Sequence, residues 1–155
     1  MADPLVIPEV NGLRDWVGKK LGTSDWLEIT QQRIDLFAEA TGDKQWIHVD
    51  PERAQRESPF GTTIAHGYLT LSLAPFLFNQ IVVVKGARLV VNPGVEHMRL
   101  RAPVRCGDRL RLHAALKGLR EIPGGALRAT ITLHYEIEGQ DRMAAFGDAA
   151  LVYYA

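Results

Sequence analysis

The segment that most constrains the fold is an almost uninterrupted apolar run that follows Gly67. We predict a helix from about His66 to Gln80, since its apolar residues fall on every side of a helical wheel: Tyr68, Leu69, Leu71, Leu73, Ala74, Phe76, Leu77 and Phe78. A helix that is apolar all round must be surrounded by protein. Pro75 lies inside it and removes one backbone hydrogen bond, so we also predict a kink or a break there.

The later part of the chain alternates between apolar and polar residues, the pattern of strands with one buried face. Four such strands are expected, separated by glycine-containing turns, at about residues 96–102, 110–116, 127–137 and 143–154. An antiparallel sheet that curls around the apolar helix would bury both, which predicts an α+β fold. Because wrapping leaves a sheet edge and part of the helix open, we expect a homodimer.

Two shorter helices are expected before the apolar run. Thr30 can cap a helix over residues 31–41, and Gly42 can end it. Asp50 followed by Pro51 is the start signal of a second helix over residues 51–57. Residues 11–27 are expected to be loosely structured, with room for one short helix and one short strand. We take residues 1–20 as a lead-in segment of a single domain that spans residues 1–155.

Composition excludes several classes of function. The chain has 155 residues with 46% hydrophobic content, which suits one domain. Eighteen basic residues balance eighteen acidic ones, so the chain has no excess positive charge to attract nucleic acid or an anionic membrane surface. Neither is expected as a partner. Cys106 is the single cysteine, which suits a reducing cytosol. The first ten residues do not resemble a signal peptide, and the apolar run falls short of a membrane span, so we expect a cytoplasmic protein.

An acid and an imidazole stand five residues apart at the end of the first helix. Asp43 follows Gly42, and His48 comes shortly before the next helix start. With no regular helix expected between them, the two side chains can converge on one small volume, where they could share a water and move protons. Gly61 and Gly67 bracket a loop that enters the apolar helix, whose free backbone N–H groups can face a developing negative charge. Together these features suggest chemistry at a carbonyl.

These residues resemble a known family, the MaoC-like (R)-specific enoyl-coenzyme A hydratases, which have the hotdog fold. Its motif of an aromatic and small residues before Gly-Asp, then three positions, an aliphatic residue and His, is matched by Phe37, Ala40, Thr41, Gly42, Asp43, Ile47 and His48, continued by Asp50 and Pro51. A second matching element is residues 64–67, and a third is residues 102–104 with the turn at 107–108. The likeness runs from about residue 21 to 155. Within the family, the pattern is most similar to the branch once grouped with nodulation protein N.

The chain departs from the family pattern at two places. The family usually has Asn-Pro where this chain has Gln45 and Trp46. Gln can still donate and accept hydrogen bonds, and Trp46 adds bulk that can reshape the pocket. The family also often has a Ser in the apolar helix near the position of Pro75, where Ser72 could partly substitute.

The resemblance implies roles for individual residues. Asp43 would act as the base toward a bound water, His48 would hold that water and share its proton, and the N–H of Gly67 would bind the thioester oxygen. Gln45 is expected to orient these groups, Trp46 to shape the substrate pocket, and His66 to fix the loop. Taken singly, a Gly-Asp pair is common turn chemistry and a lone histidine is usually structural; the catalytic interpretation rests on their combination.

Other candidate sites are not expected to function. A metal site built from His48, Asp50 and His66 is not favoured, since Asp50 is explained as an N-cap and His66 as a loop anchor. Cys106 lies beside a turn glycine without a matched base, so we do not expect a nucleophile there. The arginines at residues 99, 101, 105 and 109 are expected to form a solvated strand face, and some could meet coenzyme A phosphates.

The resemblance therefore implies reversible hydration of trans-2-enoyl thioesters to (R)-3-hydroxyacyl thioesters. No metal or redox cofactor is expected, and coenzyme A would enter as part of the substrate. Two alternatives stay open. One is a hotdog acyl-coenzyme A thioesterase, which would release a free thiol. The other is a non-catalytic acyl-thioester-binding or scaffold subunit, in which the Gln45-Trp46 and Pro75 departures would mark lost activity.

Overall fold

A computed structural model of the chain describes residues 3–155. Its strands are β1 (Leu5–Ile7), β2 (Lys19–Thr23), β3 (Leu27–Glu28), β4 (Val82–Val84), β5 (Leu89–Leu100), β6 (Arg109–Ile122), β7 (Ala126–Ile137) and β8 (Ala145–Tyr154). Its helices are the 3-10 helix η1 (Val10–Trp16), α1 (Gln31–Thr41), α2 (Trp46–Val49), α3 (Pro51–Glu57), α4 (Gly67–Ser72) and α5 (Ala74–Phe78). The fold is therefore α+β, as the sequence predicts.

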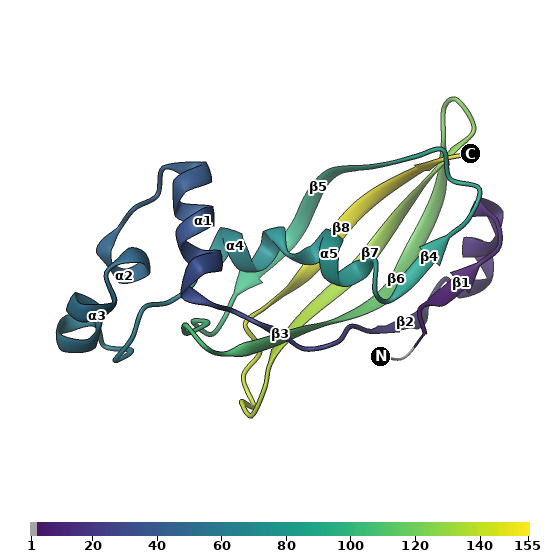
Figure 1. Cartoon of the computed structure of the whole chain (residues 1–155). Coiled ribbons are helices and arrows are strands. Elements are labelled where there is room, and N and C mark those ends of the chain that lie inside the picture. Colours follow the sequence, from purple (N-terminus) through teal and green to yellow (C-terminus); the bar gives the residue numbers. More distant parts are fainter. Residues whose placement is uncertain (1–2) are drawn as a thin grey trace.

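One antiparallel sheet curves around the helix pair α4–α5 (Figure 1). The strand order is β2-β6-β7-β8-β5, with β3 also paired to β6, and β1 and β4 form a separate parallel pair. Helices α1, α2 and α3 project beyond one end of the sheet, while β1, β4 and η1 lie at the other end (Figure 1). The two ends of the helix pair thus face different surroundings.

The alternating pattern of the strands places one face of the sheet on the helix pair. Leu112 is paired with Tyr135, and Leu116 with Ile131, and all four are fully buried. The hydroxyl of Tyr135 donates to the carbonyl of Leu71 at 3.2 Å, which joins the sheet to the helix pair. Burial raises the pKa of Tyr135, so this hydroxyl stays a neutral donor. The predicted strands over residues 110–116, 127–137 and 143–154 correspond to β6, β7 and β8.

The apolar run forms two short helices instead of one, which confirms the predicted break. Helix α4 ends at Ser72, and Pro75 lies in the first turn of α5, where its missing N–H costs no hydrogen bond. The sheet leaves part of the helix pair open in the single chain, as the sequence predicts. Tyr68 is 78% exposed and Phe76 is 54% exposed, because the sheet covers only the opposite side.

The residues predicted to start α1 and α3 and to end α1 do so in the structure. The side chain of Thr30 accepts from the N–H of Arg33 at 3.2 Å, and Gly42 ends α1 in the left-handed conformation with φ 80°. Asp50 accepts from the N–H of Arg53 at 3.0 Å at the start of α3. The expectation of no regular helix between Asp43 and His48 is wrong, because the single turn α2 lies there.

The N-terminal segment is more ordered than predicted. Ile7, Val10 and Leu13 are buried in the core, and β1 pairs with β4 in a parallel register. Neither β1 nor β4 was expected, because three-residue strands carry too few positions for an alternating pattern to emerge.

Strand β5 forms the edge of the sheet and is exposed along most of its length. It begins at Leu89, well before the strand expected from residue 96, and its register against β8 shifts twice. Such bulges disrupt the strict alternation on which the sequence prediction relied. Among residues 3–155, no helix is long and apolar enough to cross a membrane.

Candidate active site

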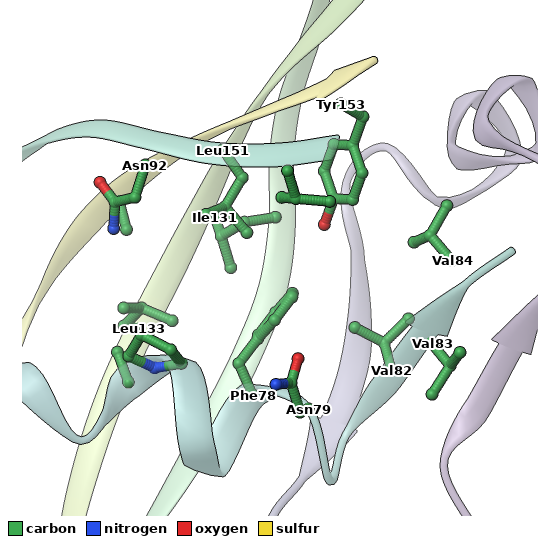
Figure 2. Close-up of a pocket in the computed structure, with 14 residues that line it drawn as sticks. Phe78, Asn79, Val82, Val83, Val84, Asn92, Ile131, Leu133, Leu151 and Tyr153 are labelled. Carbon is green, nitrogen blue, oxygen red and sulfur yellow. The ribbon is translucent and has the colours of Figure 1, made fainter. Parts of the chain in front are cut away.

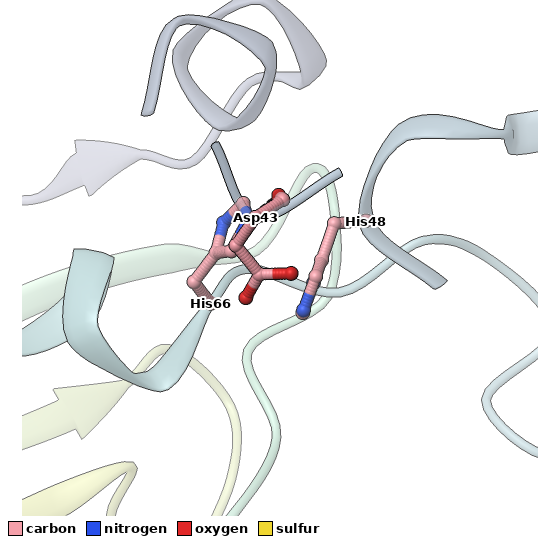
Figure 3. Close-up of side chains that lie close together, drawn as sticks. All are labelled: Asp43, His48 and His66. Atoms are coloured by element: carbon pink, nitrogen blue, oxygen red, sulfur yellow. Dashed lines mark hydrogen bonds between the residues drawn. The ribbon is translucent and has the colours of Figure 1, made fainter. Parts of the chain in front are cut away.

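The candidate residues gather where the projecting helices meet the start of α4. Asp43 lies in the connection between α1 and α2, His48 belongs to α2, and His66 immediately precedes α4. Figure 3 shows the carboxylate of Asp43 beside the two imidazole rings. Residues that are 23 positions apart in sequence thus share one small volume.

Asp43 presents its carboxylate with few local restraints. The left-handed turn at Gly42 ends α1 and turns the chain toward the site. Asp43 is exposed, and its Oδ1 receives only a long contact of 3.4 Å from the N–H of Gln45. A carboxylate held this loosely keeps lone pairs available for a water or a substrate.

His48 is buried and held in one orientation. It is 6% exposed, and its Nδ1 lies 2.7 Å from the carbonyl oxygen of Ile64. Because a carbonyl oxygen only accepts, Nδ1 carries the hydrogen, which leaves Nε2 to interact with other groups. The backbone of His48 is also tied down, since Gln31 donates to its carbonyl at 2.7 Å.

Gln31 belongs to a support that the sequence analysis missed. Its Oε1 accepts from the hydroxyl of Thr63 at 2.5 Å, so one amide side chain links α1, α2 and the loop before α4. Gln31 is merely the first residue after the cap of α1. Nothing in its sequence context signals this contact.

His66 connects the other parts of the site. Its Nε2 donates to the backbone carbonyl of Asp43 at 2.9 Å, and its ring stacks on His48 with centroids 3.9 Å apart. Phe37 contacts it from another side at 5.0 Å. His66 is only 3% exposed, and its Nδ1 has no hydrogen-bond partner within residues 3–155. His66 therefore joins the start of α4 to the α1–α2 connection and to the ring of His48.

The three side chains lie close enough together to bind one water molecule. One side-chain ligand atom from each of Asp43, His48 and His66 lies within 4.8 Å of the others. Two groups that hydrogen-bond one water at about 2.8 Å lie about 4.6 Å apart. Asp50 was considered with the two histidines as a metal ligand, but its side chain caps α3.

Gly67 occupies the first position of α4, where the helix provides no acceptor for its N–H. A Cβ at this position would lie 2.3 Å from Cδ1 of Leu100, at the end of β5. Glycine therefore lets the edge strand approach the start of the helix. The N–H of Gly67 makes no backbone hydrogen bond within residues 3–155, which is compatible with binding an oxygen atom there.

Gln45 and Trp46 lie at the border of the site. Gln45 is exposed, and it contacts Asp43 only through its backbone N–H. The half-buried ring of Trp46 lies under the guanidinium of Arg53, 4.4 Å from its centroid, and so ties α2 to α3.

A separate cavity of about 570 Å³ lies at the other end of the helix pair. It is bounded by α5, β4, β5 and the inner face of β7 and β8, and Figure 2 shows Phe78 and Tyr153 entering it from opposite sides. None of its fourteen lining residues carries a charge. Burial raises the pKa of Tyr153 to about 12, so its hydroxyl also stays neutral. The cavity does not include Asp43, His48 or Gly67.

Comparison with known proteins identifies the family. The MaoC like domain profile matches residues 14–135. The chain belongs to the MaoC-like dehydratase family. It is 47% identical to 3-hydroxyacyl-thioester dehydratase Z of Mycobacterium tuberculosis (strain ATCC 25618 / H37Rv), over 89% of this chain and 91% of that protein. It is 42% identical to nodulation protein N of Rhizobium leguminosarum bv. viciae, over 83% of this chain and 80% of that protein.

Solved structures confirm the hotdog fold. The (R)-hydratase from A. caviae involved in PHA biosynthesis superposes with a TM-score of 0.70 at 27% identity, covering 87% of this chain and 94% of that one. A monoamine oxidase regulatory protein from Archaeoglobus fulgius superposes with a TM-score of 0.76 at 20% identity, covering 99% of both chains. The second likeness concerns the fold alone.

The hydrogen bonds of the site predict opposite tautomers for the two stacked histidines. Neutral His48 should carry its hydrogen on Nδ1, bound to Ile64, and neutral His66 on Nε2, bound to Asp43. Nitrogen-15 NMR at about pH 9, above the ordinary imidazole range, distinguishes the two forms. The same tautomer in both rings would contradict this geometry.

Proposed function

We propose that this chain catalyses the reversible hydration of trans-2-enoyl thioesters to (R)-3-hydroxyacyl thioesters, as a hydro-lyase. The observation that carries the proposal is the meeting of Asp43 and His48 within 4.8 Å, beside the free N–H at the start of α4. A relative named for dehydration of 3-hydroxyacyl thioesters, at 47% identity, supports the same reaction.

Each step of the reaction has a group to perform it. Asp43 and His48 hold a water, and the carboxylate takes one of its protons as the oxygen bonds to C3. The electrons of the C2–C3 double bond move toward the thioester, whose oxygen gains negative charge and is held by the N–H of Gly67. C2 then takes a proton from the Asp43–His48 pair. General acid–base groups of this kind typically contribute about 10²–10⁴-fold each.

The proposed steps require no metal or redox cofactor. Coenzyme A or an acyl carrier protein would enter only as the thiol part of the substrate. Among the arginines considered from sequence, Arg109 is paired with Glu138 at 2.9 Å, and Arg101 lies over the ring of Phe146. Arg105 is exposed and bridges to Ile64, the residue that anchors His48, so it is best situated to meet a phosphate of the carrier.

The uncharged cavity supports an acyl thioester as the substrate. It begins at Ala74 and Pro75, on the helix that continues from the one headed by Gly67. A thioester bound at Gly67 could direct its hydrocarbon tail along this helix pair into an environment without charge. Cavities of this size commonly accommodate small ligands.

One assay distinguishes hydration from the two alternatives. Hydration removes the double bond conjugated with the thioester, so the enoyl ultraviolet absorbance of crotonyl-coenzyme A, or of a longer homologue, should fall while no thiol is released. The product should be oxidised by a dehydrogenase specific for (R)-3-hydroxyacyl thioesters and not by an (S)-specific one. Thiol release without loss of absorbance would favour a thioesterase. Thermal stabilisation by the ligand with no chemistry at any chain length would favour a scaffold.

We expect Asp43→Asn and His48→Gln each to lower hydration by about 10²-fold or more, because both changes remove a basic group while roughly keeping its size. The double variant should be little worse than the more damaging single one, since both residues act on one water. Gln45→Ala is the matched comparison and should have a smaller effect, as Gln45 contacts Asp43 only through its backbone. Near-normal turnover with unchanged circular dichroism would remove the altered residue from the mechanism.

We further propose a homodimer in the cytoplasm. Strand β5 exposes the apolar residues Leu89, Val90, Val91, Val95 and Leu100, and the helix pair exposes Tyr68 and Phe76. A long apolar edge is prone to pairing, and a second copy of this chain would cover strand and helices together. The single thiol, Cys106, suits a reducing compartment.

Analytical ultracentrifugation should therefore give about twice the chain mass of 17.2 kDa at micromolar concentration. Val95→Lys, which adds a charge to the outer side of the edge strand, should shift the species toward one chain mass. A fully active wild-type monomer would rule out the dimer.

A further inference from the structure

The N-terminal strand β1 holds β4 in place at one end of the molecule. Their parallel ladder pairs Leu5 with Val82 and Ile7 with Val84. Two further backbone hydrogen bonds frame it, from the N–H of Leu5 to the carbonyl of Ile81 and from the N–H of Lys85 to the carbonyl of Ile7, both at 2.9 Å. Ile7 is 1% exposed, so the strand is also anchored through its side chain.

Strand β4 in turn forms one wall of the uncharged cavity. All three of its residues, Val82, Val83 and Val84, line that space, and Figure 2 shows them grouped on one side of it. Figure 1 shows β4 at the end of the helix pair away from α1, α2 and α3. The wall that β1 secures therefore lies at the end of the helix pair away from Asp43 and His48 (Figure 1).

Strand β1 is not part of the region that identifies the family. The family profile begins at residue 14, so β1 and the first half of η1 lie before it. Strand β4 follows the helix pair directly and makes its ladder contacts to β1 instead of to the main sheet. Without β1, the cavity wall formed by β4 would have no strand beside it.

We propose that β1 is a specificity element, which fixes the β4 wall of the cavity and so limits the length of the acyl chain that the enzyme accepts. The inference rests on the proposed function, because it takes the tail of the thioester as the occupant of the cavity. The hydrocarbon chemistry of the occupant follows from the uncharged lining. Its direction of entry follows from the course of the helix pair, which runs from Gly67 to the cavity.

The distance along the helices separates short substrates from long ones. Gly67 and Pro75 are eight residues apart, which is about 12 Å at the usual helical rise. With carbon–carbon bonds of about 1.5 Å, a crotonyl group extends less than about 5 Å and ends before the cavity. A chain of about ten carbons or more would reach it. Long chains should therefore respond to changes at β4, and crotonyl-coenzyme A should not.

A pair of proline substitutions tests the role of β1. Leu5→Pro removes the N–H that bonds to Ile81. Val6→Pro is the matched control, because in this parallel register the N–H groups of the flanking residues face β4 and that of Val6 faces away. The probes are crotonyl-, octenoyl-, dodecenoyl- and hexadecenoyl-coenzyme A, with kcat/KM measured for each and a melting curve for each variant.

We expect kcat/KM of the wild type to fall beyond a certain chain length, and Leu5→Pro to move this fall to longer chains. For the two substrates on either side of this fall, the kcat/KM of the longer divided by that of the shorter should rise by about tenfold. This is the discrimination that one methylene typically carries. Val6→Pro should leave the ratio unchanged. Val84→Phe, in the intact chain, should move the limit in the opposite direction by filling the cavity, which keeps the test valid if Leu5→Pro does not fold.

Several results would overturn the proposal. They are a wild type without a length limit up to hexadecenoyl-coenzyme A, an unchanged ratio in folded Leu5→Pro, or an equal loss for all four substrates in folded Leu5→Pro. If Leu5→Pro does not fold, an unchanged length limit in Val84→Phe overturns the proposal. If the wild type hydrates none of the four, the proposed function itself fails, and this outcome differs from all the others.

Discussion

The rest of the structure depends on the burial of an apolar helix pair against a curved sheet. Leu69, Leu73 and Leu77 face the sheet and are almost fully buried, and the bond from Tyr135 to Leu71 fixes the pair along its axis. Removing this much apolar surface from water is the main favourable term in folding. Because the pair is fixed, its two ends become reference points. The start of α4 positions the candidate active site, and the end of α5 bounds the cavity.

The active-site end is built from loops and short helices, which need their own supports. The stacking of His66 on His48 and its bond to Asp43 connect the first residue before α4 to the chain that leaves α1. Gln31 adds a second connection through Thr63 and the carbonyl of His48. Groups that move protons must be held within hydrogen-bond reach of one water, and these contacts supply that restraint without using the carboxylate of Asp43 or Nε2 of His48.

Local signals account for what the sequence could predict. The caps at Thr30 and Asp50, the stop at Gly42 and the break at Pro75 depend on neighbours within a few residues, and all were predicted. Asp43 and His48 were recognisable because their spacing is also local. The stacking of His66 on His48, the Gln31–Thr63 contact and the parallel pairing of β1 with β4 join residues far apart in sequence, so no periodicity reveals them. The early start of β5 was missed because its bulges interrupt alternation.

The edge strand links the proposed assembly to the proposed chemistry. Leu100 ends β5, is 56% exposed, and lies where a side chain on residue 67 would have to be. Whatever covers β5 therefore restricts the rotamers of Leu100, and with them the space beside the N–H of Gly67. A second copy paired along β5 would supply that restriction on both chains by symmetry. The site in an isolated chain would then contain every chemical group but would lack one wall, so dimer formation and binding of the thioester oxygen should be thermodynamically coupled.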